Sequence, residues 1–163
     1  MRILLRIFSC FSLTVISISY SQSSEYSSDK EYKNDNGSSY NRVIEFKDLV
    51  REMITSKDTI LRYENVFFIC DYDVLEGCRE MIDSIGSNKV NAEVIIANSG
   101  FGFDTSHFGL TIPYFKGLAF ERKFKISGEK PIQGLIFEDC NFKNGVEITI
   151  RNAGIEFIGC NIN

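Results

Sequence analysis

The sequence repeats itself after 20 residues close to its C-terminal end. Residues 134–142 read GLIFEDCNF and residues 154–162 read GIEFIGCNI, so that four of nine positions are identical. Self-similarity of this period is typical of solenoids, in which each repeat contacts only its neighbours in the stack. The repeat therefore predicts that this part of the chain winds into β-coils that lie on top of one another.

The spacing within the repeat resembles that of the pentapeptide-repeat family. The stretch Cys140-Asn141-Phe142-Lys143-Asn144 matches the family unit, in which Ala or Cys is followed by Asp or Asn, by Leu or Phe and by two polar residues. The resemblance covers about residues 117–163 and is clear over about residues 134–163. It implies a mainly β protein that forms a right-handed parallel β-helix with four five-residue sides in each coil.

In such a β-helix, residues one coil apart lie above one another at the ordinary strand spacing of about 4.8 Å. We therefore expect Cys160 above Cys140 and Phe157 above Phe137, with all four side chains pointing inward. Glu147 stands where a large inward apolar residue is expected, so the β-helix is predicted to be irregular. The alternative is a small antiparallel β domain whose self-similarity is accidental.

The first residues predict export. Arg2 and Arg6 precede an uncharged apolar stretch, Ile7 to Ile18, and small residues follow at the spacing that signal peptidase requires. This pattern is typical of a secretory signal peptide, which we assign to residues 1–21. A retained signal anchor is the alternative, although the apolar stretch is shorter than the ~20 residues of a membrane-spanning helix. We expect no membrane association after cleavage.

Residues 22–42 are predicted to form a disordered polar leader, because they contain no aliphatic residue whose burial could offset the entropy of ordering. Removal of residues 1–21 takes away two of the 18 basic residues and none of the 22 acidic ones, so the net charge changes from −4 to −6. An acidic chain without a basic patch argues against nucleic acid as a partner.

A single domain is expected over residues 43–163. An amphipathic helix is predicted at residues 45–56, because its apolar residues recur at helical spacing along one face. β-Solenoids need caps, since an end rung exposes core and unpaired backbone, and we assign this helix as the N-terminal cap. A second helix is predicted at residues 74–86, followed by helix-stop residues. Short strands are predicted at residues 93–97, 110–112, 118–120, 124–126, 132–137, 146–150 and 155–158, after β-type segments around Ile60 and Val66–Ile69.

Four cysteines follow the signal peptide: Cys70, Cys78, Cys140 and Cys160. An exported protein can pair an even number of cysteines, so a disulfide between Cys140 and Cys160 is one reading. Stacked side chains point in parallel, however, which leaves their Cβ atoms about 4.8 Å apart and beyond the usual disulfide distance. We therefore favour free thiols that act as small core residues.

No residue set predicts catalysis, a cofactor or a metal site. His107 lies near Asp104 and Ser106, but no nucleophile elbow accompanies them. Residues 98–103 form a Gly-rich stretch that lacks the lysine of a phosphate-binding loop. The remaining candidates are two acidic pairs, Asp71 with Asp73 and Glu138 with Asp139, which are too few to form the groove of a polysaccharide-acting β-helix enzyme.

The sequence favours an exported, non-catalytic β-helical protein with a structural or protein-binding role at the cell envelope, in the periplasm or outside the cell. The alternative is a carbohydrate-active β-helix enzyme or a remnant of one. The last repeat unit stops at Asn163, two residues short of a full unit. We therefore expect the domain to be incomplete at its C-terminus, with self-association through an open last rung as the runner-up.

Cleavage of the signal peptide can be measured on the exported protein. We expect mass spectrometry of the mature N-terminus to find residues 1–19 or 1–21 absent, because signal peptidase cuts after small residues at these positions. An intact Met1 on a cytoplasmic protein would contradict the prediction.

Overall fold

The computed structural model describes residues 32–33, 37–70, 74–103, 112–151 and 153–163. These residues form a mainly β protein with two helices, as the sequence predicted at the level of the fold class. Neither helix of the described part is long and apolar enough to cross a membrane. The predicted signal peptide, residues 1–21, lies outside the described residues and stays a prediction.

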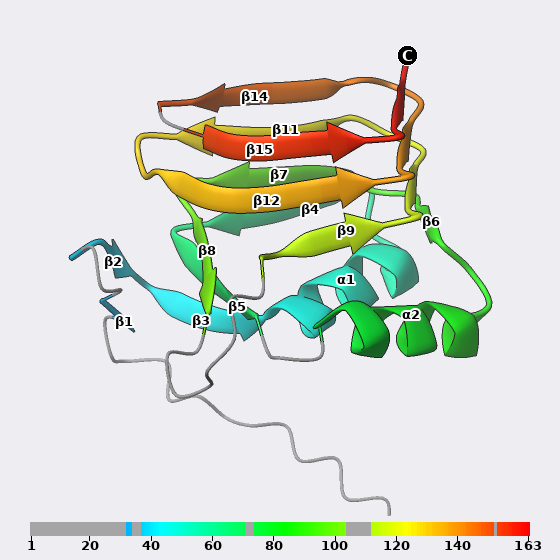
Figure 1. Ribbon diagram of the computed structural model, residues 1–163, viewed down its shortest axis with the longest axis horizontal. Helices are drawn as coiled ribbons and strands as arrows, with labels where there is room; N and C mark the ends of the chain where they lie inside the picture. Colours follow the sequence, from blue (N-terminus) through cyan, green and yellow to red (C-terminus); the bar gives the residue numbers. More distant parts are fainter. Residues whose placement is uncertain (1–31, 34–36, 71–73, 104–111, 152) are drawn as a thin grey trace, which may run out of the picture.

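Most strands belong to three parallel sheets that surround the core (Figure 1). The first sheet has the order β14-β11-β7-β4, made by Val146–Ile150, Phe124–Gly128, Glu93–Ala97 and Ile60–Glu64. The second has the order β15-β12-β9, made by Ala153–Ile158, Ile132–Glu138 and Tyr114–Lys116. The third has the order β16-β13-β10-β6, made by Asn161–Ile162, Asn141–Phe142, Ala119–Phe120 and Lys89–Val90. Because neighbouring strands in all three run parallel, the antiparallel alternative is excluded.

Two smaller groups of strands complete the β structure. A fourth parallel sheet has the order β3-β5-β8, made by Arg42–Glu45, Val66–Cys70 and Gly100–Phe103. An antiparallel pair is formed by β1 (Tyr32–Lys33) and β2 (Ser39–Tyr40).

From β9 onward the chain visits the second, third and first sheets in that order and then repeats the circuit (Figure 1). Each circuit adds one strand to each sheet, and we call these three strands a rung. Phe137 pairs with Phe157, so the last step is the predicted 20 residues, whereas Phe115 pairs with Phe137 at a step of 22. The rung has three strands of unequal length, with seven residues in β12, two in β13 and five in β14, rather than four sides of five residues each.

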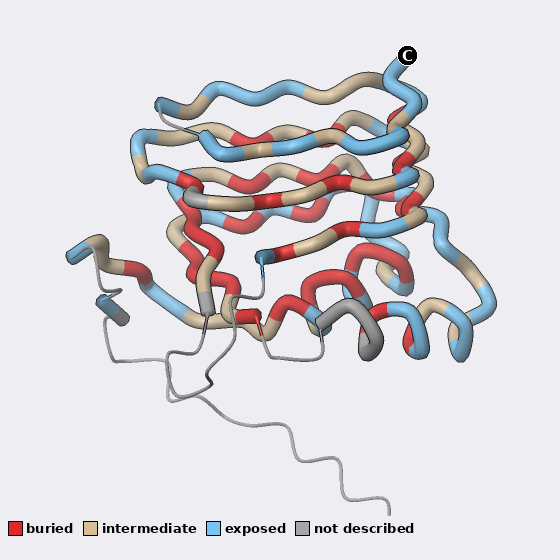
Figure 2. Tube along the Cα trace, viewed as in Figure 1, coloured by how far each residue is buried: buried red, intermediate tan, exposed pale blue. Residues whose placement is uncertain are grey.

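The core consists of side chains that stack in columns from one rung to the next. The rings of Phe115 and Phe137 lie 5.0 Å apart, and those of Phe137 and Phe157 lie 5.1 Å apart and nearly parallel. In the third sheet, Phe120 and Phe142 stack at 4.7 Å. The predicted stacking of Phe157 on Phe137 is therefore confirmed. Figure 2 shows buried positions recurring along the strands of the middle rungs.

Helix α1 (Phe46–Thr55) covers one end of the stack (Figure 1). All five residues of the expected apolar stripe are buried, which confirms the amphipathic helix: Phe46, Leu49, Val50, Met53 and Ile54. The ring of Phe46 lies 4.7 Å from that of Phe115, so the helix continues the aromatic column beyond the last strand. On the same side, the Tyr63 hydroxyl donates a hydrogen bond of 2.8 Å to Glu52 and ties the helix to β4. Burial and this neighbouring carboxylate raise the pKa of Tyr63.

Helix α2 (Val74–Ile85) packs beside α1 and confirms the second predicted helix. It ends as expected at Gly86, whose φ of 70° is favourable for glycine and whose N–H donates to the carbonyl of Ile82 at 2.9 Å.

Ordered structure begins earlier than the sequence predicted, inside the polar leader of residues 22–42. Tyr40 is only 1% exposed and its ring lies 5.1 Å from that of Phe67. The Lys130 ammonium lies 3.9 Å from the centre of the Tyr40 ring and also donates to the backbone carbonyl of Ser39. Aromatic burial thus orders residues 39–40 without the help of an aliphatic residue. Residues 22–31 and 34–36 of the predicted leader lie outside the described part.

The column of stacked rings can be tested by truncation. Phe137→Ala should lower the free energy of unfolding by about 3–5 kcal/mol, because this fully buried ring has a neighbour on each side. Phe157→Ala should cost distinctly less, since the ring is partly exposed. Urea unfolding of both variants, with the exposed Glu156→Ala as control, measures the difference, and equal losses at the two rings would argue against the stack.

Candidate functional site

The last strands of the three sheets, β14, β15 and β16, are together called the terminal rung, and this rung is open. Each of these strands is the last one in the order of its sheet, so that one edge has no partner strand among the described residues (Figure 1). The N–H and C=O groups along such an edge are free to pair with another strand. Among the described residues, the terminal rung therefore carries backbone groups to which a further strand could pair.

The apolar columns of the core also end uncovered on this rung. Ile148 is 37% exposed, whereas Ile126, its partner in the rung below, is 1% exposed. Ile162 is 50% exposed, whereas its partner Phe142 is fully buried. Figure 2 shows the same change, because the terminal rung lacks the buried positions of the rungs below it. Side chains with core chemistry and core orientation are thus left facing solvent.

Charged side chains lie on the outer surface of the sheets instead. Lys123 and Glu147 form an ion pair of 2.8 Å, and the hydrogen bond from Lys123 holds the pKa of Glu147 below its usual range. Similar pairs join neighbouring rungs between Lys116 and Glu138, between Lys125 and Glu93, and between Lys143 and Glu121. Glu147 is in register with Lys125, whose side chain points outward. The charge of Glu147, which the sequence placed at an inward position, therefore lies on the surface and leaves no gap in the core.

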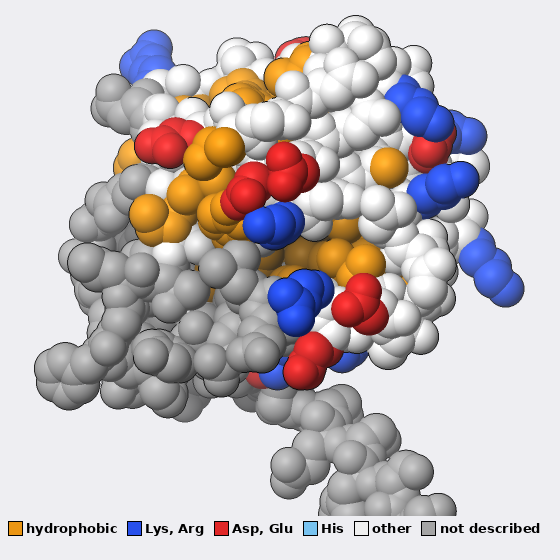
Figure 3. All heavy atoms as spheres, turned by 45° about the vertical axis from the view of Figure 1, so that its right-hand side comes forward, with side chains coloured by type: hydrophobic (Ala, Val, Ile, Leu, Met, Phe, Trp, Pro, Cys, Tyr) orange, Lys and Arg blue, Asp and Glu red, His pale blue; other side chains and the backbone are white. Residues whose placement is uncertain are grey.

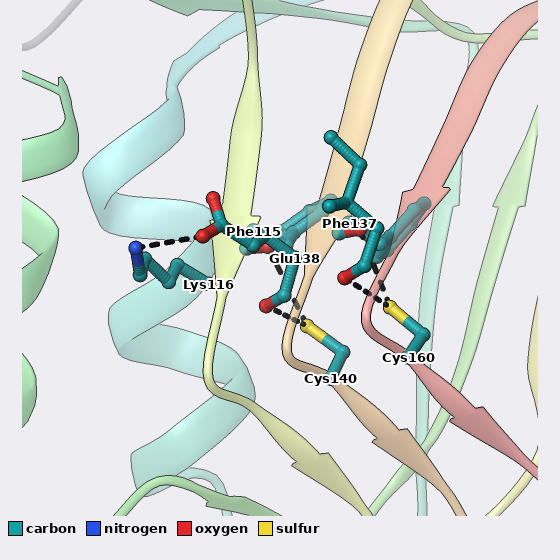
Figure 4. Close-up of polar contacts among 7 residues, drawn as sticks. Phe115, Lys116, Phe137, Glu138, Cys140 and Cys160 are labelled. Atoms are coloured by element: carbon teal, nitrogen blue, oxygen red, sulfur yellow. Dashed lines mark hydrogen bonds and ion pairs between the residues drawn. The ribbon is translucent and has the colours of Figure 1, made fainter.

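Cys140 and Cys160 occupy equivalent corners of successive rungs and are free thiols (Figure 4). The Cys140 thiol donates to the carbonyl of Phe115 at 3.4 Å, and the Cys160 thiol donates to the carbonyl of Phe137 at 3.2 Å. Each thiol therefore contacts the backbone of the rung below, and the two sulfurs form no disulfide. Burial raises the pKa of Cys140 to about 12, which keeps this thiol neutral and unreactive.

Of the acidic and histidine candidates of the sequence, only Glu138 and Asp139 belong to the described residues. Asp71, Asp73, Asp104, Ser106 and His107 lie outside the described residues. Glu138 is held by Lys116 at 2.9 Å, as Figure 4 shows, and Asp139 has a positive φ of 52° in the turn that follows β12. Among the described residues, no group of three histidine, cysteine, aspartate or glutamate side chains could hold a metal ion.

The Gly-rich stretch at residues 98–103 leads into strand β8, which the sequence did not predict. Ser99 is buried, donates to the carbonyl of Ala97 at 2.8 Å and accepts the N–H of Val66 at 3.1 Å. A Cβ at Gly100 or Gly102 would collide with the side chains of Tyr40 or Phe67. The glycines therefore allow close packing of the fourth sheet and do not form an anion site.

Comparison with known proteins gives no relative for this arrangement. No family model matches the sequence, and no curated protein or solved structure matches it. The function is therefore argued from the geometry of the terminal rung.

Thiol labelling tests the burial of the cysteines. In the folded protein we expect a thiol-specific reagent to modify Cys160, which is partly exposed, at least about tenfold faster than Cys70, Cys78 or Cys140, which are buried. Burial also raises the pKa of Cys78 to about 11, which reduces its thiolate fraction further. Peptide mapping by mass spectrometry identifies the labelled sites, and fast labelling of Cys140 would contradict the inward placement.

Proposed function

We propose that this chain is an exported, non-catalytic β-helical protein that binds protein at the cell envelope through its open terminal rung. The observation that carries the proposal is the uncovered end of the core, where Ile148 and Ile162 continue buried columns and yet are exposed. Exposed side chains of this kind on an unpaired edge mark an interaction site.

The right-handed β-helix is part of this proposal. Its support is the fixed order in which the chain visits three parallel sheets, with each circuit adding one strand to each. Connections between parallel strands of one sheet are right-handed in nearly all proteins, because the twist of the strands favours that hand. The stretch from Cys140 to Asn144 resembles a pentapeptide-repeat unit, and this resemblance also supports a right-handed β-helix.

The partner that fits the terminal rung best is a second copy of the chain. Two copies placed end to end about a twofold axis would bring the same apolar columns together, which is the usual geometry of homodimers. The strand edges of one copy would satisfy the free N–H and C=O groups of the other. Glu147 and Glu156 do not oppose this contact, because they are in register with the outward positions of Lys125 and Ile136.

Association can be tested by light scattering coupled to size-exclusion chromatography. The protein should run as a dimer at micromolar concentration, and Ile162→Lys should make it a monomer by placing a charge on the end of a core column. Ile158→Lys is the matched control, because Ile158 lies in the same rung and is similarly exposed at 47% but follows the inward Phe157 and points outward. A wild-type monomer, or a dimer that survives Ile162→Lys, would overturn the proposal.

A further inference from the structure

A groove lies at the other end of the stack, between α2 and β9. Its volume is about 750 Å³, a size typical of pockets that hold small molecules or short peptide segments. Figure 3 shows a hollow with hydrophobic side chains in the middle of this face, with charged side chains above and below it. The apolar part of the lining is formed by Val50, Cys78, Ile82, Phe115 and Leu118.

One wall of the groove is a strand edge that has no partner strand in the described part of the chain. β9 is the last strand of the second sheet, opposite to the open terminal rung. Ile136 donates to the carbonyl of Pro113, and Gly117 donates to the carbonyl of Glu138, each at 2.9 Å. Alternate residues of a parallel strand direct their backbone groups to the same neighbour, so these bonds place the N–H and C=O groups of Tyr114 and Lys116 on the other edge. That edge faces α2 and not another described strand.

The charged residues on the lining are Arg79 and Asp83 on α2 and Lys116 on β9. Lys116 is already paired with Glu138, and Arg79 is exposed and has no ion pair or hydrogen bond within the described part of the chain. Lys47, whose charge lowers the pKa of Cys78, is itself paired with Glu45 at 2.8 Å. Among the described residues, Arg79 is therefore the cation on the lining that has no carboxylate partner. A carboxylate on a ligand would find Arg79 available as a partner.

We propose that this groove binds an extended acidic peptide segment of another protein by strand addition to β9. The peptide backbone would pair with the N–H and C=O groups of Tyr114 and Lys116. Alternate side chains of an extended chain point to the same side, so apolar residues at every second position would lie on the floor formed by Val50, Cys78 and Leu118. An acidic side chain of the peptide would pair with Arg79. This site is independent of the terminal rung.

A random heptapeptide library displayed on phage is the probe, used with the full chain carrying Ile162→Lys so that association through the terminal rung does not contribute. We expect enrichment of peptides with apolar residues at alternate positions and at least one acidic residue. Arg79→Glu should weaken binding of the enriched peptides by about tenfold or more, as loss of a charge-assisted hydrogen bond does. Arg62→Glu is the matched control, because Arg62 is exposed on β4 and does not line the groove.

Hydrogen exchange distinguishes strand addition from other binding modes. The amides of Tyr114 and Lys116 should exchange more slowly when an enriched peptide is bound, because their N–H groups become donors in a new ladder. The proposal is overturned if no peptide is enriched, if Arg79→Glu binds as tightly as Arg62→Glu, or if the two amides gain no protection.

Discussion

The stacking of inward side chains from rung to rung is the interaction on which the rest of this structure depends. The rings of Phe46, Phe115, Phe137 and Phe157 follow one another at 4.7, 5.0 and 5.1 Å, close to the ordinary strand spacing of about 4.8 Å. The distance between stacked rings therefore matches the distance between hydrogen-bonded strands. A slip of one residue in any strand would turn its core side chains outward, so the column also fixes which residues face solvent.

The two ends of this column differ in what covers them. At one end, Phe46 of α1 supplies a ring in place of a further strand, and the bond between Tyr63 and Glu52 ties the helix to the first sheet. At the other end, Ile148 and Ile162 have no cover among the described residues. Among the described residues, one end of the stack is thus covered by a helix and the other is not, and this asymmetry is the physical basis for the proposal that the terminal rung binds protein.

Periodicity predicted much of the fold, because the spacing of apolar residues indicates both helices and the repeated strands. The sequence did not reveal β8 or β9, whose identity depends on distant partners. In β8, Gly100 and Gly102 weaken the local strand signal because they make room for Tyr40 and Phe67. The order of residues 39–40 likewise depends on Lys130, far along the chain, which no local pattern could indicate.

The candidate sites differ in the same way. The terminal rung could be predicted from the repeat, because the spacing of the last repeat unit places Ile162 at a core position. The groove could not be predicted, because it joins residues of α1, α2 and β9 that share no motif. Only the fold shows that α2 lies beside β9 where a sheet would otherwise continue (Figure 1). β9 is short, carries Lys116 and is overhung by a helix, which are features that protect edges from indiscriminate pairing. An edge protected in this way admits a strand only if the side chains of that strand also fit the groove, so the proposed peptide site would be more selective than the terminal rung.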